Sequence, residues 1–138
     1  MRSLLIGILL LVYCPLNAQI LRVMTYNIRV DIPSDSLNSW EDRKHRVVQL
    51  LRFYEPAIFG IQEGLPHQVY YLDSLMKKYT FVGKGRDGGT KGEYSAIFYD
   101  MDKFKIIMDS TLWLSETPHT PSVGWDAALN RVLTLAIL

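Results

Sequence analysis

Two polar residues, Asn27 and Glu63, stand at the carboxyl ends of two predicted β-strands, residues 21–28 and 57–62. Ligands of open α/β sheets bind outside these strand ends, so an amide oxygen and a carboxylate would converge there if the strands are neighbours. Such an oxygen-rich, sulfur-free site suits Mg²⁺, Mn²⁺ or Ca²⁺ better than Zn²⁺. The spacing alone leaves an ordinary interpretation open, with Asn27 as a turn residue and Glu63 as a helix-start carboxylate.

Further candidates are basic side chains near loops. Arg86 lies in the stretch 83–92, which holds five glycines. Glycine lets backbone amides approach an anion closely, and arginine can bind phosphate through two nitrogens. Arg131 follows another polar loop and is a second candidate to face a phosphate. The alternatives are a flexible surface loop for Arg86 and a strand-edge charge for Arg131.

The three histidines are weaker candidates for a general base. We expect His45 to be solvated on a charged helix face and His119 to be structural in a proline-rich loop. His67 falls in the first turn of a helix shortly after Glu63, so it is the one histidine placed to line the site. None of the three is predicted to be the base.

The elements that position these residues begin with a helix over residues 40–54. The run 39–42, Ser-Trp-Glu-Asp, resembles a capping box, with Asp where Glu or Gln is usual, and the pair 55–56, Glu-Pro, ends the helix. Strand, helix and strand with short connections indicate a βαβ unit. The predicted inward face of this helix is Val47, Leu50, Leu51 and Tyr54.

A second helix is predicted from Pro66, which suits a first helical turn. The later chain is strand-rich and favours antiparallel meanders, so the fold class is α/β at the front and β-heavy at the back. The residues expected to point inward from the second helix are Val69, Leu72, Leu75, Met76 and Tyr79. The later predicted strands are 79–82, 94–99, 104–108, 111–114 and 131–138.

Composition bounds the function only loosely. The chain has 138 residues, 49% of them apolar, which fits one domain or part of one. Lys and Arg total 15 and Asp and Glu total 14, so the chain lacks the strongly basic balance of a dedicated nucleic-acid binder. A nuclease is not excluded, because locally placed basic residues can suffice.

The first 18 residues have the pattern of a signal peptide. Arg2 supplies the positive start, residues 4–12 are an apolar run too short to span a bilayer, and Ala18 precedes a plausible cleavage site. We therefore expect a secreted or periplasmic chain from residue 19 onward. Two alternatives are an uncleaved anchor and a lipoprotein modified at Cys14, which is disfavoured because Tyr13 is large. Cys14 is the sole cysteine, so the mature part is expected to contain no disulfide.

The chain stops at Leu138 inside an apolar strand pattern. We expect a chain cut short, because a last strand of this kind needs a neighbouring strand and a covering layer. The alternative is a small complete domain that ends on a central strand.

These motifs together resemble the opening of the endonuclease/exonuclease/phosphatase family. A strand ending in Tyr-Asn, a helix introduced by Trp-x-x-Arg and a strand ending in Gln-Glu form a specific tripartite match, and the likeness, to a secreted bacterial branch, covers residues 21–138. The segments that carry it are 23–28, 40–43, 58–63, 85–89, 92–99, 113–118 and 124–128.

The resemblance implies a four-layer α/β/β/α sandwich of the DNase I-like type, incomplete at its carboxyl end. It implies phosphoester hydrolysis by metal-assisted attack of water, with Mg²⁺, or Mn²⁺ or Ca²⁺, as cofactor. Glu63 would be the principal metal ligand, and Asn27 would support the metal and the scissile phosphate. Glu93 matches a family carboxylate that orients the catalytic histidine; the alternative is an exposed strand-start residue.

The family pattern continues with a central His, a Gly-Asp-x-Asn segment and an Asp-His pair, none of which occurs in these 138 residues. Two hypotheses follow. The chain is part of a metal-dependent hydrolase acting outside the cytoplasm, or it is a truncated product without catalysis. When complete, the protein is expected to be a monomer without a stable protein partner.

The substrate is a phosphoester that the sequence does not identify, because the family acts on DNA, RNA, phosphoinositides, sphingomyelin and other phosphoesters. Trp113, Trp125 and Tyr94 could stack on a base or sugar, although aromatic residues at such positions are more often core.

Overall fold

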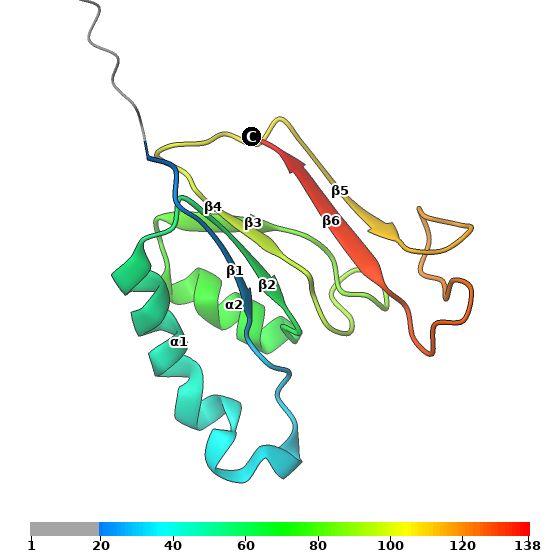
Figure 1. Ribbon diagram of the computed structural model, residues 1–138, viewed down its shortest axis with the longest axis horizontal. Coiled ribbons are helices and arrows are strands. Elements are labelled where there is room, and N and C mark those ends of the chain that lie inside the picture. The colour runs from blue at the N-terminus through cyan, green and yellow to red at the C-terminus, as the bar shows by residue number, and fades with distance from the viewer. Residues whose placement is uncertain (1–19) are drawn as a thin grey trace, which may run out of the picture.

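The computed structural model describes residues 20–138 (Figure 1). The expected signal peptide, with Arg2 and Cys14, lies outside the described residues and stays a prediction. Within residues 20–138 no helix has the length and apolar character needed to cross a membrane. The elements in chain order are β1 Val23–Asn27, the 3₁₀ helix η1 Pro33–Asn38, α1 Trp40–Tyr54, β2 Ile58–Gln62, α2 Pro66–Leu75, β3 Tyr79–Val82, β4 Ile97–Asp100, β5 Met108–Trp113 and β6 Val132–Ile137.

The predicted βαβ unit is confirmed. β1 and β2 pair in parallel, with Asn27 opposite Gln62, and α1 connects them. β4 then runs antiparallel to both β2 and β3, which gives the strand order β1-β2-β4-β3. The register is the feature that matters for the site, because it brings Asn27 level with the end of β2.

Helix α1 begins as the capping pattern predicts and buries a different face at its end. The Ser39 hydroxyl accepts a hydrogen bond of 3.3 Å from the amide of Asp42, and Glu55 ends the helix in the left-handed conformation. The prediction that Tyr54 points inward is wrong, since its side chain is 51% exposed and packs edge-on against Phe53. The buried residues begin at Trp40, the first residue of α1, so the contact surface lies nearer the start of the helix than predicted.

Helix α2 starts at Pro66 as predicted, and Val69 and Leu72 are fully buried. Leu75 is wrong as a core residue, because it occupies the last turn and is 38% exposed. Gln68, a polar residue between these apolar positions, is completely buried instead. Its three hydrogen bonds to backbone atoms account for this burial.

The β-rich second half is confirmed, with two corrections. Residues 104–107 form no strand; pairing begins at Met108, where β5 first meets Ile137 of β6. Residues 94–96 also precede β4 rather than belong to it. Tyr94 instead forms isolated antiparallel β-bridges with Gly64 and Gly85. Its amide donates a 2.8 Å hydrogen bond to the carbonyl of Gly64. This bridge ties the loop before β4 to the end of β2.

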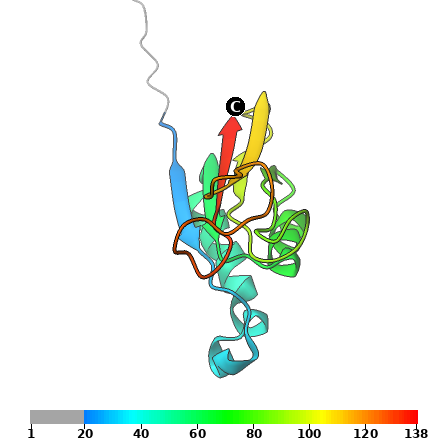
Figure 2. The same cartoon turned by 90° about the vertical axis from the view of Figure 1, so that its right-hand side faces the viewer.

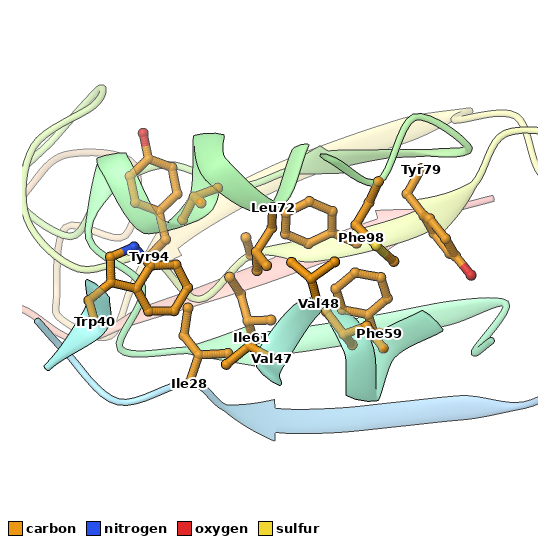
Figure 3. Close-up of a cluster of buried hydrophobic side chains, with 14 residues drawn as sticks. Ile28, Trp40, Val47, Val48, Phe59, Ile61, Leu72, Tyr79, Tyr94 and Phe98 are labelled. Carbon is orange, nitrogen blue, oxygen red and sulfur yellow. The ribbon is translucent and has the colours of Figure 1, made fainter. Parts of the chain in front are cut away.

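The core lies between the two helices and the four-stranded sheet (Figure 3). At its centre the rings of Phe59 and Phe98 stack across β2 and β4, with centroids 4.7 Å apart. Figures 1 and 2 show β5 and β6 as a separate sheet on the side of the four-stranded sheet opposite the helices. The described residues thus form helix, sheet and sheet layers of a mixed α/β fold.

The two sheets meet closely at Gly83. A methyl group added there would lie 3.2 Å from Ala96 Cα and 3.2 Å from Thr134 Oγ1, and its φ of +129° is a conformation that favours glycine. Beside it, the amide of Lys84 donates to the Thr111 hydroxyl at 3.1 Å. The second sheet therefore anchors the start of the glycine-rich loop.

Candidate functional site

Asn27 and Glu63 meet at the carboxyl ends of the parallel strands β1 and β2. The Asn27 Nδ2 donates a 2.7 Å hydrogen bond to Glu63 Oε1. The Asn27 Oδ1 accepts a 2.9 Å bond from the amide of Arg29, which fixes the orientation of the side-chain amide. The predicted convergence of these two residues is present, with the amide nitrogen of Asn27 facing the carboxylate.

Glu63 occupies a left-handed conformation, with φ of +62°, where the chain turns from β2 toward α2. Its second oxygen accepts a 3.2 Å hydrogen bond from the amide of Val30. The hydrogen bond from Asn27 and then that from Val30 lower the pKa of Glu63. Burial opposes them with a smaller rise, and the charges of Arg29 and Arg43 lower the pKa a little further. The carboxylate is therefore ionised at neutral pH.

The loop after β1 is held by Arg43, a residue that does not belong to the predicted inward face of α1. Its Nη2 donates to the carbonyl of Arg29 at 2.7 Å, its Nε donates to the carbonyl of Asn38 at 2.9 Å, and its Nη1 donates to the carbonyl of Ile28. The guanidinium also lies over the Trp40 ring, 5.2 Å from the centroid. The Trp-x-x-Arg motif thus has a structural role beside Glu63 that helix periodicity did not indicate.

One pocket of about 300 Å³ brings all five predicted site residues together. Strand ends of the first sheet, the glycine-rich loop and the start of β6 form its walls. Its lining residues are Asn27, Gln62, Glu63, Arg86, Glu93, Tyr94, Ser95, Leu114, Asn130, Arg131 and Val132.

Within this pocket Arg86 and Glu93 form an ion pair, with Arg86 Nη2 3.0 Å from Glu93 Oε1. Their backbones are joined too, because the Arg86 amide donates to the Glu93 carbonyl at 2.9 Å. The carbonyl of Arg86 accepts hydrogen bonds from Trp113 Nε1 at 2.6 Å and from Asn130 Nδ2 at 3.1 Å. The arginine is therefore fixed in position on a loop that its composition alone would suggest is flexible.

The histidines lie elsewhere among the described residues, and none lines this pocket. His67 Nε2 lies 2.8 Å from Asp31 Oδ2, beside the loop that carries Val30. His45 Nδ1 lies 3.1 Å from the Tyr71 hydroxyl, and His119 is exposed. Our suggestion that His67 lines the site thus has no support in the pocket lining.

The aromatic candidates divide between core and surface. Trp113 and Tyr94 are buried, which fits the core interpretation, whereas the Trp125 side chain is 77% exposed. Trp125 has a φ of +49° and follows Gly124, which lies against the backbone of Leu114, a pocket residue. Arg131 is exposed at the pocket rim, where a phosphate from solvent can reach it.

The donors at the strand ends fit a hard divalent cation. Among residues 20–138 no three His, Cys, Asp or Glu side chains gather as a metal cluster. Mg²⁺, however, commonly binds through one or two protein carboxylates and keeps its other positions for water and phosphate. Each Glu63 oxygen accepts one neutral hydrogen bond and keeps a lone pair for a metal.

Comparisons with known proteins identify the fold. No family model matches the sequence. An endonuclease/exonuclease/phosphatase family protein of Bacteroides thetaiotaomicron has a TM-score of 0.81 and 42% identity over 84% of this chain and 43% of that chain. A mannosyl-6-phosphatase of the same organism has the same TM-score and identity over 84% of this chain and 45% of that one. An uncharacterized protein of Acanthamoeba polyphaga mimivirus is 30% identical over 135 residues, 84% of this chain and 20% of that protein.

The chain thus spans less than half the length of the solved structures that it resembles and about a fifth of the viral protein. Over that length the likeness confirms the predicted mixed α/β, DNase I-like fold class and the resemblance that the sequence motifs carried.

Proposed function

We propose that this chain is a member of the endonuclease/exonuclease/phosphatase family, as its 42% identity to solved structures over 84% of its length supports. In this proposal it supplies the metal-anchoring and phosphate-binding part of a divalent-metal-dependent phosphoester hydrolase. The observation that carries the proposal is the convergence of Asn27, Glu63, Arg86, Glu93 and Arg131 on one pocket. These residues come from segments far apart in the chain and comprise two carboxylates, an amide and two guanidinium groups. That is the chemistry expected around a cation and a phosphate.

Glu63 would hold the metal, Mg²⁺ or alternatively Mn²⁺ or Ca²⁺. When bound, such an ion polarises a phosphoryl oxygen and stabilises the charge that develops on it during attack by water. Asn27 orients the Glu63 carboxylate through the 2.7 Å hydrogen bond, while its own Oδ1 accepts the amide of Arg29. The ionised state of Glu63 is the one that a metal requires.

Arg86 and Arg131 would bind the phosphate oxygens of the substrate. Arg86 is already neutralised in part by Glu93, so a phosphate entering the pocket would share its guanidinium with that carboxylate. Arginine suits this position because its five donors can serve two acceptors at once. By family resemblance Glu93 would also orient a catalytic histidine; within the described residues its partner is Arg86.

We propose a phosphomonoester of a sugar as the substrate class to test first. The support is the 42% identity to a protein named as a mannosyl-6-phosphatase and the near-neutral charge of the chain, which does not favour long nucleic acids. A secreted or periplasmic location, from the signal-like first 18 residues, and a monomeric state are parts of the same proposal.

The test measures phosphate release by the full-length protein from mannose 6-phosphate, and cleavage of bis(4-nitrophenyl) phosphate, with Mg²⁺ and with a chelator. The expected result is chelator-sensitive release that is faster from the sugar monoester. Equal rates with and without chelator would contradict the metal requirement, and turnover of the diester alone would contradict the substrate class.

A further inference from the structure

Gln68 is the polar side chain most deeply buried beside the candidate site. It is fully buried on α2, and three hydrogen bonds satisfy it. Its Oε1 accepts from the amides of Leu65 at 3.0 Å and Asp31 at 3.2 Å, and its Nε2 donates to the carbonyl of Arg29 at 3.0 Å. A carboxamide is the one side-chain group of this size that both donates and accepts in this way.

The bond to Arg29 leads directly to Glu63. The carbonyl of Arg29 and the amide of Val30 belong to one peptide unit, which is planar and rigid. Gln68 binds the carbonyl end of this unit, and the amide end donates to Glu63 Oε2 at 3.2 Å. Rotation of the peptide would therefore break both contacts together, so the orientation of the Val30 amide depends on Gln68.

Two further contacts keep this peptide in place. Arg43 Nη2 donates to the same Arg29 carbonyl at 2.7 Å, and Gln68 holds the next amide along, that of Asp31. Both lone pairs of the Arg29 carbonyl are then used by side-chain donors. Donors on a carbonyl also polarise the amide of the same peptide, which strengthens its bond to the carboxylate.

From this arrangement we infer that Gln68 is a positioning residue for Glu63, acting through the Arg29–Val30 peptide to set the carboxylate that the proposed function assigns to the metal. The hydrogen bonds give the positioning of Glu63, and its effect on metal binding rests on the proposed function. A partner of a metal ligand of this kind commonly changes metal affinity by about 10–100-fold when removed.

The test has two readouts on the full-length, metal-free protein. The first is hydrogen exchange at the Val30 amide, which we expect to become about tenfold faster in Gln68→Met. The second is the Kd for Mn²⁺ alone, which we expect to weaken about tenfold. Gln68→Leu is a second variant of similar size, which also removes all three hydrogen bonds without adding a charge.

Two controls separate positioning from general loss of stability. His67→Ala removes a neighbouring contact to the same loop, at the Asp31 side chain rather than at the peptide. Tyr79→Phe removes a buried hydrogen bond of 2.9 Å to the carbonyl of Pro56, far from Glu63 in the sheet. Both should leave Val30 exchange and Mn²⁺ affinity near wild type.

The outcomes distinguish this inference from the proposed function. Unchanged Val30 exchange in both Gln68 variants would overturn the inference. So would wild-type Mn²⁺ affinity in those variants when Glu63→Gln abolishes binding. If Val30 exchange quickens in the Gln68 variants while even Glu63→Gln binds Mn²⁺ normally, the hydrogen-bonded link stands and the metal role of Glu63 fails.

Discussion

The carboxylate of Glu63 accepts its shortest hydrogen bond, 2.7 Å, from the side-chain amide of Asn27, 36 residues earlier in the chain. The bond joins the carboxyl ends of two parallel strands that are held in register by backbone pairing. It fixes a carboxylate at the edge of the sheet with a lone pair left on each oxygen.

Arg86→Met should lower kcat/KM by about tenfold or more, mainly through KM. The variant removes a charged donor from the pocket, and a hydrogen bond to a charged group contributes about 1.5–3 kcal/mol. Lys91→Met is the control, because Lys91 is exposed on the same loop and does not line the pocket. Steady-state kinetics with the best substrate of the panel would test this, and equal KM values for the two variants would refute the phosphate role.

Asp100→Asn should destabilise the fold at neutral pH by about 1.5–2 kcal/mol, the low end of the range for charged hydrogen bonds, because Lys78 is half exposed and can return to water. Asp100 is 1% exposed and lies 2.9 Å from Lys78 Nζ. Burial alone raises the pKa of Asp100, but Lys78, the Asp102 amide and Lys103 together hold it below the ordinary value.

The stabilisation of the fold by the Asp100 carboxylate should depend on pH. A carboxyl whose pKa is lower in the folded state stabilises the fold above its unfolded pKa of about 4, and this contribution is lost as pH falls through the folded value. The difference in unfolding free energy between wild type and Asp100→Asn should therefore shrink below pH 4. Urea unfolding at pH 7 and pH 3 measures it, with the exposed Asp102→Asn as control; a constant difference would exclude the ion pair as the cause.

Gly83→Ala should destabilise the protein by about 1–3 kcal/mol, because alanine is strained at a φ of +129° and its methyl group would press on Thr134 of the second sheet. Gly60→Ala is the matched control in β2, where the nearest atom to an added methyl lies 3.8 Å away. The control should stay within about 0.5 kcal/mol of wild type. Similar unfolding midpoints for the two variants would argue against close sheet contact at Gly83.

Much of the site could be predicted from the sequence, because strand-end positions are set by simple periodicity. Two apolar strands joined by one amphipathic helix place Asn27 and Glu63 at the same sheet edge. The glycine-rich and polar loops then pointed to Arg86 and Arg131, and the family resemblance added Glu93; all three line the same pocket. Their roles in binding and catalysis stay predictions.

The residues that sequence analysis missed are polar side chains bonded to backbone atoms. Arg43 reads as a solvated helix residue, and only the folded loop supplies the carbonyls that it binds. Gln68 offered a signal, since it stands on the buried stripe of α2 with Val69 and Leu72, where a polar residue needs partners. Tyr54 and Leu75 show the converse: the apolar period continues into the last turns of the helices, where these side chains are exposed.

The most direct test of the central claim compares Glu63→Gln with Glu116→Gln in the full-length protein. Glu116 is an exposed carboxylate that does not line the pocket. We expect Glu63→Gln to lower Mg²⁺-dependent kcat/KM by at least about 100-fold, since removing a metal ligand should cost at least as much as removing the residue that orients it. Glu116→Gln should keep wild-type activity. Wild-type activity and metal dependence in Glu63→Gln would contradict the account.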